Sequence, residues 1–197
     1  MRVVGDIRKD KLKTLKKATS IAEQNFAQHN PSQYFASIID NLKRPEDHFF
    51  VHVTEAATRF LAVPKRNLHV SVFEDKATGI EGGERRYGNI VAITAKTPKG
   101  QIHQVPVKDL VTLQTMLITE TPVFSRVLYT IKEASKKKPY VVSLRAIQTS
   151  NFLTAEVSQI PWKTLSKTAE EILETCPKVS SVCYDVTPKP PATIEME

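Results

Sequence analysis

The sequence has few of the residues that hold small secreted proteins together. It contains two cysteines, Cys176 and Cys183, among 197 residues, too few for a disulfide framework or a metal cluster. No apolar run approaches the ~18 residues that a membrane-spanning helix needs. No secretory signal follows Met1. We therefore expect a cytoplasmic protein that does not span a membrane, with both cysteines reduced and buried among apolar side chains.

Motifs of catalysis and metal binding are also scarce. Of the five histidines, only His48 and His52 have a spacing that could place both on one helix face, and no third ligand accompanies them. There is no Gly-x-Ser-x-Gly elbow, and no Gly-Lys-Ser/Thr follows the glycine-rich stretch at residues 78–87. From its residues alone, the chain predicts no self-contained catalytic set and no metal of its own.

What the sequence does have is an excess of positive charge. Its 28 basic and 21 acidic residues give a net charge of +7, which favours anionic partners such as nucleotides, phosphates or nucleic acid. Two basic runs, at residues 8–17 and 132–138, fit a solvated helix face and a linker. Neither has the interleaved aromatic residues of a surface that binds single strands. Nucleic-acid binding is therefore an alternative that depends on charge alone.

The spacing of apolar residues predicts a helical segment over residues 1–66. Apolar positions three and four apart predict an amphipathic helix over residues 9–29. The same pattern predicts a second helix over residues 34–42 and a third over residues 46–61. The alternation that follows, at residues 68–73, is typical of a half-buried strand.

The rest of the chain contains an internal repeat. Residues 89–95 match 140–146, residues 104–110 match 159–165, and residues 125–129 match 180–184. The repeat predicts two β-β-α-β units, residues 67–135 and 136–197, which bury their hydrophobic faces together. The predicted fold class is α+β, with mainly antiparallel sheets and helices on one face.

Two stretches could bind a ligand. Residues 78–87 hold three closely spaced glycines, which fit a plain hairpin or a close approach of the backbone to a ligand. At residues 185–197 the adjacent prolines Pro190 and Pro191 exclude a helix. This end is either a chain lying on the surface or a stiff arm that carries Lys189, Glu195 and Glu197 to a ligand. Cations from separate segments are what a phosphate monoester site requires.

The end of the chain resembles the carboxyl terminus of GMP synthetase. Residues 184–197 read Tyr-Asp-Val-Thr-Pro-Lys-Pro-Pro-Ala-Thr-Ile-Glu-Met-Glu, against the family's Tyr-Asp-(Ile/Val/Leu)-(Thr/Ser)-Ser-Lys-Pro-Pro-(Ala/Gly)-Thr-(Ile/Thr)-Glu-Trp-Glu. Residues 79–87, 142–147 and 153–156 resemble further family segments. The duplicated unit resembles the longer, eukaryote-like version of this domain.

The resemblance implies a role for the chain. In this family the domain dimerises the enzyme and completes the XMP site. An ATP pyrophosphatase domain adenylates XMP, and ammonia from a glutaminase domain displaces AMP to give GMP. Carried over, the resemblance implies that Lys189 contacts the XMP phosphate with help from Arg85, and that Ile194 and Glu195 line the nucleotide site.

Other parts of the family pattern are missing or changed. Nothing resembles the Ser-Gly-Gly-Val-Asp-Ser pyrophosphate loop, and no glutaminase cysteine is present. ATP and magnesium are therefore expected in a partner pyrophosphatase domain. The chain alone is not expected to make GMP, and a non-catalytic binding or regulatory protein is the alternative. Glu81, Gly83, Arg86 and Met196 depart from the pattern, which leaves the ribose and base contacts open.

Overall fold

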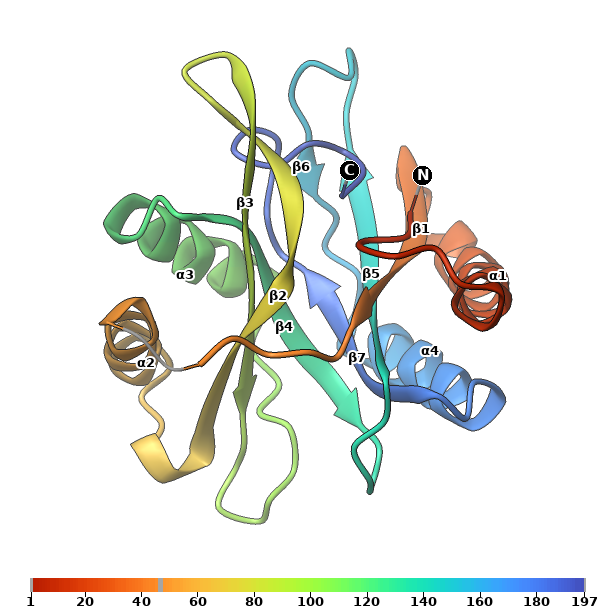
Figure 1. Cartoon of the computed structure of the whole chain (residues 1–197), viewed down its shortest axis with the longest axis horizontal. Coiled ribbons are helices and arrows are strands. Elements are labelled where there is room, and N and C mark those ends of the chain that lie inside the picture. Colours follow the sequence, from red (N-terminus) through yellow and green to blue (C-terminus); the bar gives the residue numbers. More distant parts are fainter. Residues whose placement is uncertain (1, 46–47, 197) are drawn as a thin grey trace.

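The computed structural model describes residues 2–45 and 48–196. Over these residues the chain forms four α-helices and one seven-stranded sheet (Figure 1). In chain order they are α1 Lys9–Phe26, β1 Gln33–Asp40, α2 His48–Leu61, β2 Leu68–Glu81, β3 Glu84–Ala95, α3 Val107–Glu120, β4 Phe124–Glu133, β5 Tyr140–Gln148, β6 Glu156–Val157, α4 Trp162–Thr175 and β7 Val179–Asp185. The predicted α+β class is confirmed.

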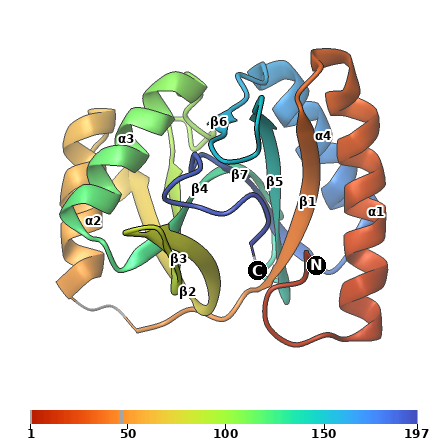
Figure 2. The ribbon, with the colours of Figure 1, turned by 90° about the horizontal axis from the view of Figure 1, so that it is seen from above.

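The sheet is mixed, and its strands follow the order β1-β5-β7-β4-β3-β2, with β6 paired to β5. The β3–β4 and β5–β7 pairs are parallel, and the other pairs are antiparallel. The sheet curls, and Figure 2 shows the helices around its outer side, while both chain ends lie on the open inner side. The main hydrophobic core lies between this outer face and the helices. In the described part of the chain, no helix is both long and apolar enough to cross a membrane.

The prediction of a helix over residues 34–42 is wrong, because this segment is strand β1. Its apolar residues are buried on both faces. Ile38 belongs to the core under the helices, and Ile39 belongs to a second core on the inner face. A strand buried on both faces loses its alternation of apolar and polar residues, so a short apolar run cannot be told from a helix by spacing.

The other predicted elements of this region are confirmed, with one gap and one extension. Helix α2 covers the predicted third helix from His48 onward, and positions 46–47 of that prediction lie outside the described residues. The predicted strand at residues 68–73 is confirmed and continues to Glu81, beyond an irregularity between Val72 and Lys76.

The internal repeat is visible in the pairing of the strands. Val91 pairs with Val127 in the first unit, and their counterparts Val142 and Val182 pair in the second. The two units meet where β4 and β7 run antiparallel, and there the counterparts Tyr129 and Tyr184 face each other. An approximate two-fold axis therefore passes between these two tyrosines.

Hydrogen bonds also follow the repeat. The Tyr129 hydroxyl donates to the His103 carbonyl at 2.8 Å, and the Tyr184 hydroxyl donates to the Ser158 carbonyl at 2.7 Å. Both tyrosines are fully buried, so these bonds satisfy hydroxyl groups that have no access to water. Each unit therefore satisfies its buried tyrosine hydroxyl with a backbone carbonyl at the equivalent position.

In each unit, one helix and one strand precede the segments that match in the repeat. Val72 of β2 pairs with Val91, and Ile38 of β1 pairs with Val142, the counterpart of Val91. Helix α2 packs on β2 as α1 packs on β1. The first unit is therefore α2-β2-β3-α3-β4, and it is inserted between β1 and β5 of the second unit, α1-β1-β5-α4-β7.

The glycine-rich stretch is a hairpin. Gly82 and Gly83 form its turn between β2 and β3, with φ angles of 60° and 87°, a combination that glycine adopts without steric cost. This confirms the simpler of the two interpretations of residues 78–87.

Gly88 lies where the backbone of β3 crosses Ser125 of β4. A Cβ atom at Gly88 would lie 2.8 Å from Ser125 Cβ and 2.9 Å from Ser125 N. We expect Gly88→Ala to lower the free energy of unfolding by ~1–3 kcal/mol, the usual cost of overpacking. Urea denaturation measures this, with Glu84→Ala, at the exposed first residue of β3, as control. An unchanged denaturation midpoint for Gly88→Ala would show that the two strands separate without cost.

Candidate functional site

The last residues of the chain form an arm, residues 186–196, that folds across the inner side of the sheet. It is tied to two other segments by backbone hydrogen bonds. Lys189 and Ala155 exchange bonds of 2.8 and 2.9 Å, and the Thr78 amide donates to the Met196 carbonyl at 3.0 Å. Ala192 and Met196 are 0% and 1% exposed. The arm is thus docked into the inner core, and a chain end lying loosely on the surface is excluded.

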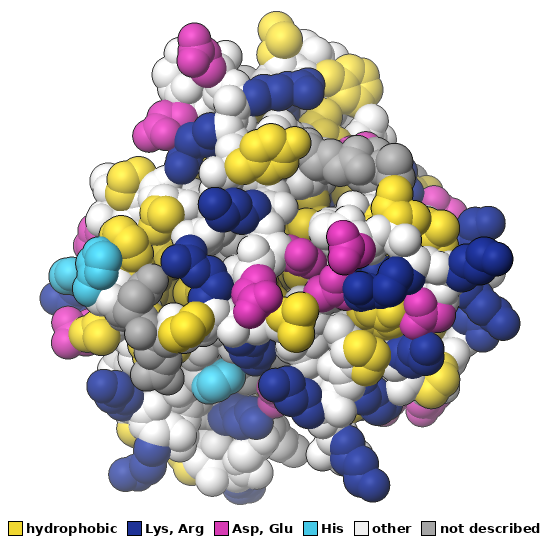
Figure 3. Space-filling view, in the orientation of Figure 1, with side chains coloured by type: hydrophobic (Ala, Val, Ile, Leu, Met, Phe, Trp, Pro, Cys, Tyr) yellow, Lys and Arg dark blue, Asp and Glu magenta, His cyan; other side chains and the backbone are white. Residues whose placement is uncertain are grey.

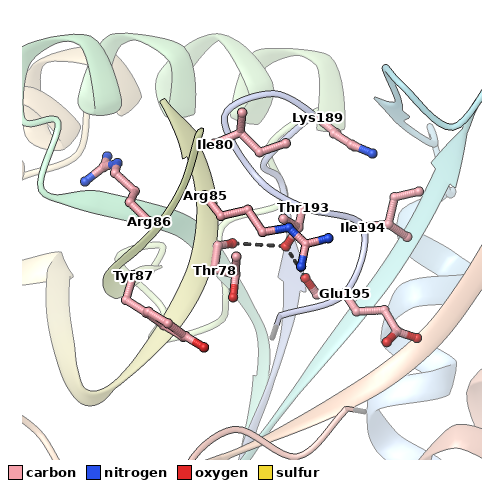
Figure 4. A pocket seen from close by; sticks show the side chains of 9 residues that line it. All are labelled: Thr78, Ile80, Arg85, Arg86, Tyr87, Lys189, Thr193, Ile194 and Glu195. Atoms are coloured by element: carbon pink, nitrogen blue, oxygen red, sulfur yellow. Dashed lines mark hydrogen bonds between the residues drawn. The ribbon is translucent and has the colours of Figure 1, made fainter. Parts of the chain in front are cut away.

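A pocket of about 490 Å³ lies between the arm and the β2–β3 hairpin. Its lining residues are Thr78, Ile80, Arg85, Arg86, Tyr87, Lys189, Thr193, Ile194 and Glu195 (Figure 4). The four residues to which the family resemblance assigns nucleotide contacts, Arg85, Lys189, Ile194 and Glu195, all line this one pocket. The fold brings them together from segments that lie far apart in the sequence.

Arg85 and Lys189 are the cations that this pocket offers to a ligand. The Arg85 side chain is exposed and reaches across the pocket toward Thr193 and Glu195 (Figure 4). Within the described residues, its guanidinium makes no hydrogen bond or ion pair. The Lys189 ammonium donates one hydrogen bond to the Phe152 carbonyl, which leaves two of its three donors for other acceptors.

Arg86 makes different contacts from the neighbouring Arg85. Figure 4 shows its side chain turned away from the pocket. Its guanidinium donates to the carbonyls of Pro122 and Phe124 and pairs with Glu81 at 2.8 Å. Of the two loop arginines, Arg86 fixes the hairpin to the start of β4, and Arg85 makes no such contact among the described residues.

Glu195 links the arm to the start of the chain. Its carboxylate lies 3.4 Å from Arg2 Nε, and the Arg2 guanidinium lies 4.3 Å from the centre of the Phe35 ring. Glu197, the second acidic residue predicted to reach the ligand, lies outside the described residues. The pocket lining therefore contains one carboxylate, from Glu195, among the residues that the structure describes.

A cluster of three buried charges lies beneath the arm. Asp185 Oδ2 is 2.8 Å from Arg145 Nη1 and 3.2 Å from Arg126 Nη1, and all three side chains are 0–1% exposed. Burial lowers the pKa of the Arg126 guanidinium to about 9, and the charge of Asp185 opposes this effect. We call these residues the buried charge cluster.

The sequence did not identify this cluster, although it holds a signal. Arg145 and Asp185 are the only charged residues of β5 and β7, and five uncharged residues separate Arg126 from the next charge in β4, Lys132. Charged residues are almost never fully buried unless they are paired. Isolated charges in otherwise apolar strands therefore predict mutual pairing, though not with which partner.

The structure supports metal binding and nucleic-acid binding less well than it supports binding of a ligand in the pocket. In residues 2–45 and 48–196, no three His, Cys, Asp or Glu side chains are grouped so as to hold a metal ion. Both cysteines are free and buried, as predicted, and burial raises the pKa of Cys183 to about 11. On the face shown in Figure 3, basic side chains alternate with acidic and apolar ones and form no continuous stripe.

Comparison with known proteins gives a consistent set of relatives. Residues 131–196 match the family model described as GMP synthase C terminal domain. The whole chain is 34% identical over 197 residues to a subunit of the glutamine-hydrolyzing GMP synthase of Sulfurisphaera tokodaii, and 35% identical over 198 residues to the same subunit from Saccharolobus solfataricus. The GMP synthase of Legionella pneumophila is 47% identical over 62 residues, which are 32% of this chain and 12% of that protein. The chain spans 46% of the length of the Sulfurisphaera and Saccharolobus relatives.

Proposed function

The chain carries the C-terminal domain of the GMP synthase family, and on that premise we propose that it binds the phosphate of XMP in the pocket under its arm. The observation that carries the proposal is the convergence of Arg85, Lys189, Ile194 and Glu195 on one pocket. A phosphate monoester needs positive charge and hydrogen-bond donors from several directions. Arg85 from β3 and Lys189 from the arm supply both from opposite sides.

The chemical step is assigned to a second component. We propose that an ATP pyrophosphatase domain, in the same chain or in a separate one, binds ATP and magnesium and adenylates XMP. This chain completes the XMP site and holds the nucleotide, and a second copy of it pairs in a dimer. The relatives from Sulfurisphaera and Saccharolobus are each named as one subunit of a GMP synthase, which implies a partner subunit for those proteins.

Exposed apolar side chains near the pocket support the docking of such a partner. Tyr87 lines the pocket and is 73% exposed. Phe152 and Leu153, on the β5–β6 loop whose carbonyl holds Lys189, are 52% and 74% exposed. Large apolar side chains at the mouth of a site are typical of surfaces that a partner covers.

Reconstitution tests the proposal. The chain is mixed with a lone ATP pyrophosphatase domain of a GMP synthase, together with XMP, ATP, magnesium and ammonia, and GMP is measured. We expect GMP to form with both proteins and to fall to the background rate when this chain is left out. XMP binding by a folded pair that forms no GMP would instead favour the non-catalytic alternative. Absence of XMP binding would contradict both.

A further inference from the structure

We propose that Arg126 and Arg145 are positioning residues that hold the arm over the pocket and give the pocket its preference for a doubly charged phosphate. This inference rests on the proposed function, and it identifies what fixes Lys189 and Glu195 beside the ligand. Neither arginine lines the pocket, so both act through the arm.

The contacts of Arg126 support the first part of the proposal. Its Nη2 donates to Thr193 Oγ1 at 2.8 Å and to the Glu195 carbonyl at 2.5 Å, with the Thr78 carbonyl at 3.4 Å. All three acceptor residues line the pocket. One buried guanidinium thus fastens the end of the arm to the hairpin strand across from it.

Arg145 holds the beginning and the middle of the same arm. Its Nη1 donates to the Thr187 carbonyl at 2.8 Å, and its Nη2 lies 3.2 Å from the Thr193 carbonyl. Lys189 lies between these two fixed points. Because the planar guanidinium sets the direction of each bond, the two arginines determine where the intervening residues can lie.

The internal repeat provides a comparison within the molecule. The counterparts of Arg145, Asp185 and Arg126 across the two-fold axis are Thr94, Thr130 and Ser181. Thr94 and Thr130 share a hydroxyl hydrogen bond of 2.7 Å at the place where Arg145 and Asp185 form an ion pair. The first unit has no arm, and its neutral pair packs equally deep in the same sheet. The charges are therefore not needed for sheet packing and occur where the arm is.

The charge balance supports the second part of the proposal. Two guanidiniums face one carboxylate, so the buried charge cluster keeps one net positive charge. In a buried position this charge is screened far less than a surface charge, and it adds to those of Arg85 and Lys189. A phosphate dianion in the pocket is attracted by all of them, and a neutral or singly charged ligand is attracted less.

The test copies the neutral residues from the other side of the two-fold axis into the buried charge cluster. The triple variant R126S/R145T/D185T replaces each of the three charged residues by its counterpart, Ser181, Thr94 or Thr130. Hydrogen exchange of the Thr78, Ile80 and Ala155 amides reports on the arm, because these amides donate to arm carbonyls. We expect the variant to unfold cooperatively, to lose about tenfold or more of this amide protection, and to bind XMP and inorganic phosphate about tenfold or more weakly.

The control is T94V/T130V, which removes the hydroxyl pair of the first unit at the same depth in the sheet. It is expected to keep the protection of the arm amides and the affinity for both ligands. Wild-type protection or wild-type phosphate affinity in the triple variant would overturn the proposal. If the unmodified chain bound neither XMP nor phosphate, that result would count against the proposed function and against the charge preference. Amide protection would then decide the positioning role alone.

Discussion

Replacing Asp185 by asparagine is expected to lower the free energy of unfolding by about 3–5 kcal/mol, the usual cost of removing one partner of a buried ion pair. Asparagine keeps nearly the same shape and can still accept the bond that the Thr187 amide donates to Oδ1, at 3.0 Å. The loss therefore comes from charge. Arg126 and Arg145 are 0% and 1% exposed, and without Asp185 two buried guanidiniums lose the carboxylate that pairs them.

Urea denaturation is the measurement, with the midpoint compared at unchanged slope. The matched control is Glu170→Gln, which removes a carboxylate from an ion pair with Lys132 in which both side chains are largely exposed, 55% and 40%. Screening by water makes that pair worth little, so a change within about 0.5 kcal/mol is expected. If the two substitutions lowered the free energy of unfolding equally, water would have to reach the buried charge cluster and screen its charges.

The sequence predicted the fold well wherever a pattern had enough length or was repeated. Helix α1 spans more than four turns with one apolar stripe, and the duplicated strands and helices supported each other's assignment. Strand β1 was mispredicted because six of its eight residues are buried, and they lie on both faces of the sheet. The partnership of β1 with β5 could not be read from the sequence either, since the first unit lies between them in the chain.

The residues of the candidate site could be selected from the sequence because they belong to two recognisable segments. The tail around Lys189 and the loop around Arg85 each resemble the family pattern, and the structure brings them to one pocket. The buried charge cluster beneath the arm could not be predicted from the sequence. Arg126 acts on the arm from β4 of the other unit, and nothing in a linear pattern connects Arg126 with Asp185 until the two strands are paired.

The two duplicated units contribute different residues to the pocket. The pairing of β4 with β7 is symmetric, yet the residues beside the axis are not. One side has threonines and no arm, and the other has charges, an arm and a pocket. The first unit contributes Arg126 and the hairpin with Arg85, and the second contributes Arg145, Asp185 and Lys189. The pocket is therefore formed jointly by the two units, and neither has a complete set of the cations.

The double variant R85A/K189A is expected to abolish XMP binding at concentrations that saturate the unmodified chain with its partner domain. Each lost charge-assisted hydrogen bond costs ~1.5–3 kcal/mol, and two opposed cations together cost up to ~3–6 kcal/mol if their effects add. That range corresponds to a loss of affinity of about 10²- to 10⁴-fold. Both side chains are at the surface of the pocket, so the unfolding midpoint should change little.

Calorimetric titration of XMP measures the affinity, and the two single variants complete a cycle. Arg86→Ala is the matched control, because Arg86 is the neighbouring cation and lines the same pocket but points away from it (Figure 4). It is expected to bind XMP far more tightly than the double variant does. Unchanged affinity in R85A/K189A would contradict the assignment of the phosphate site. A larger loss in Arg86→Ala than in Arg85→Ala would mean that the hairpin turns its other arginine toward the ligand.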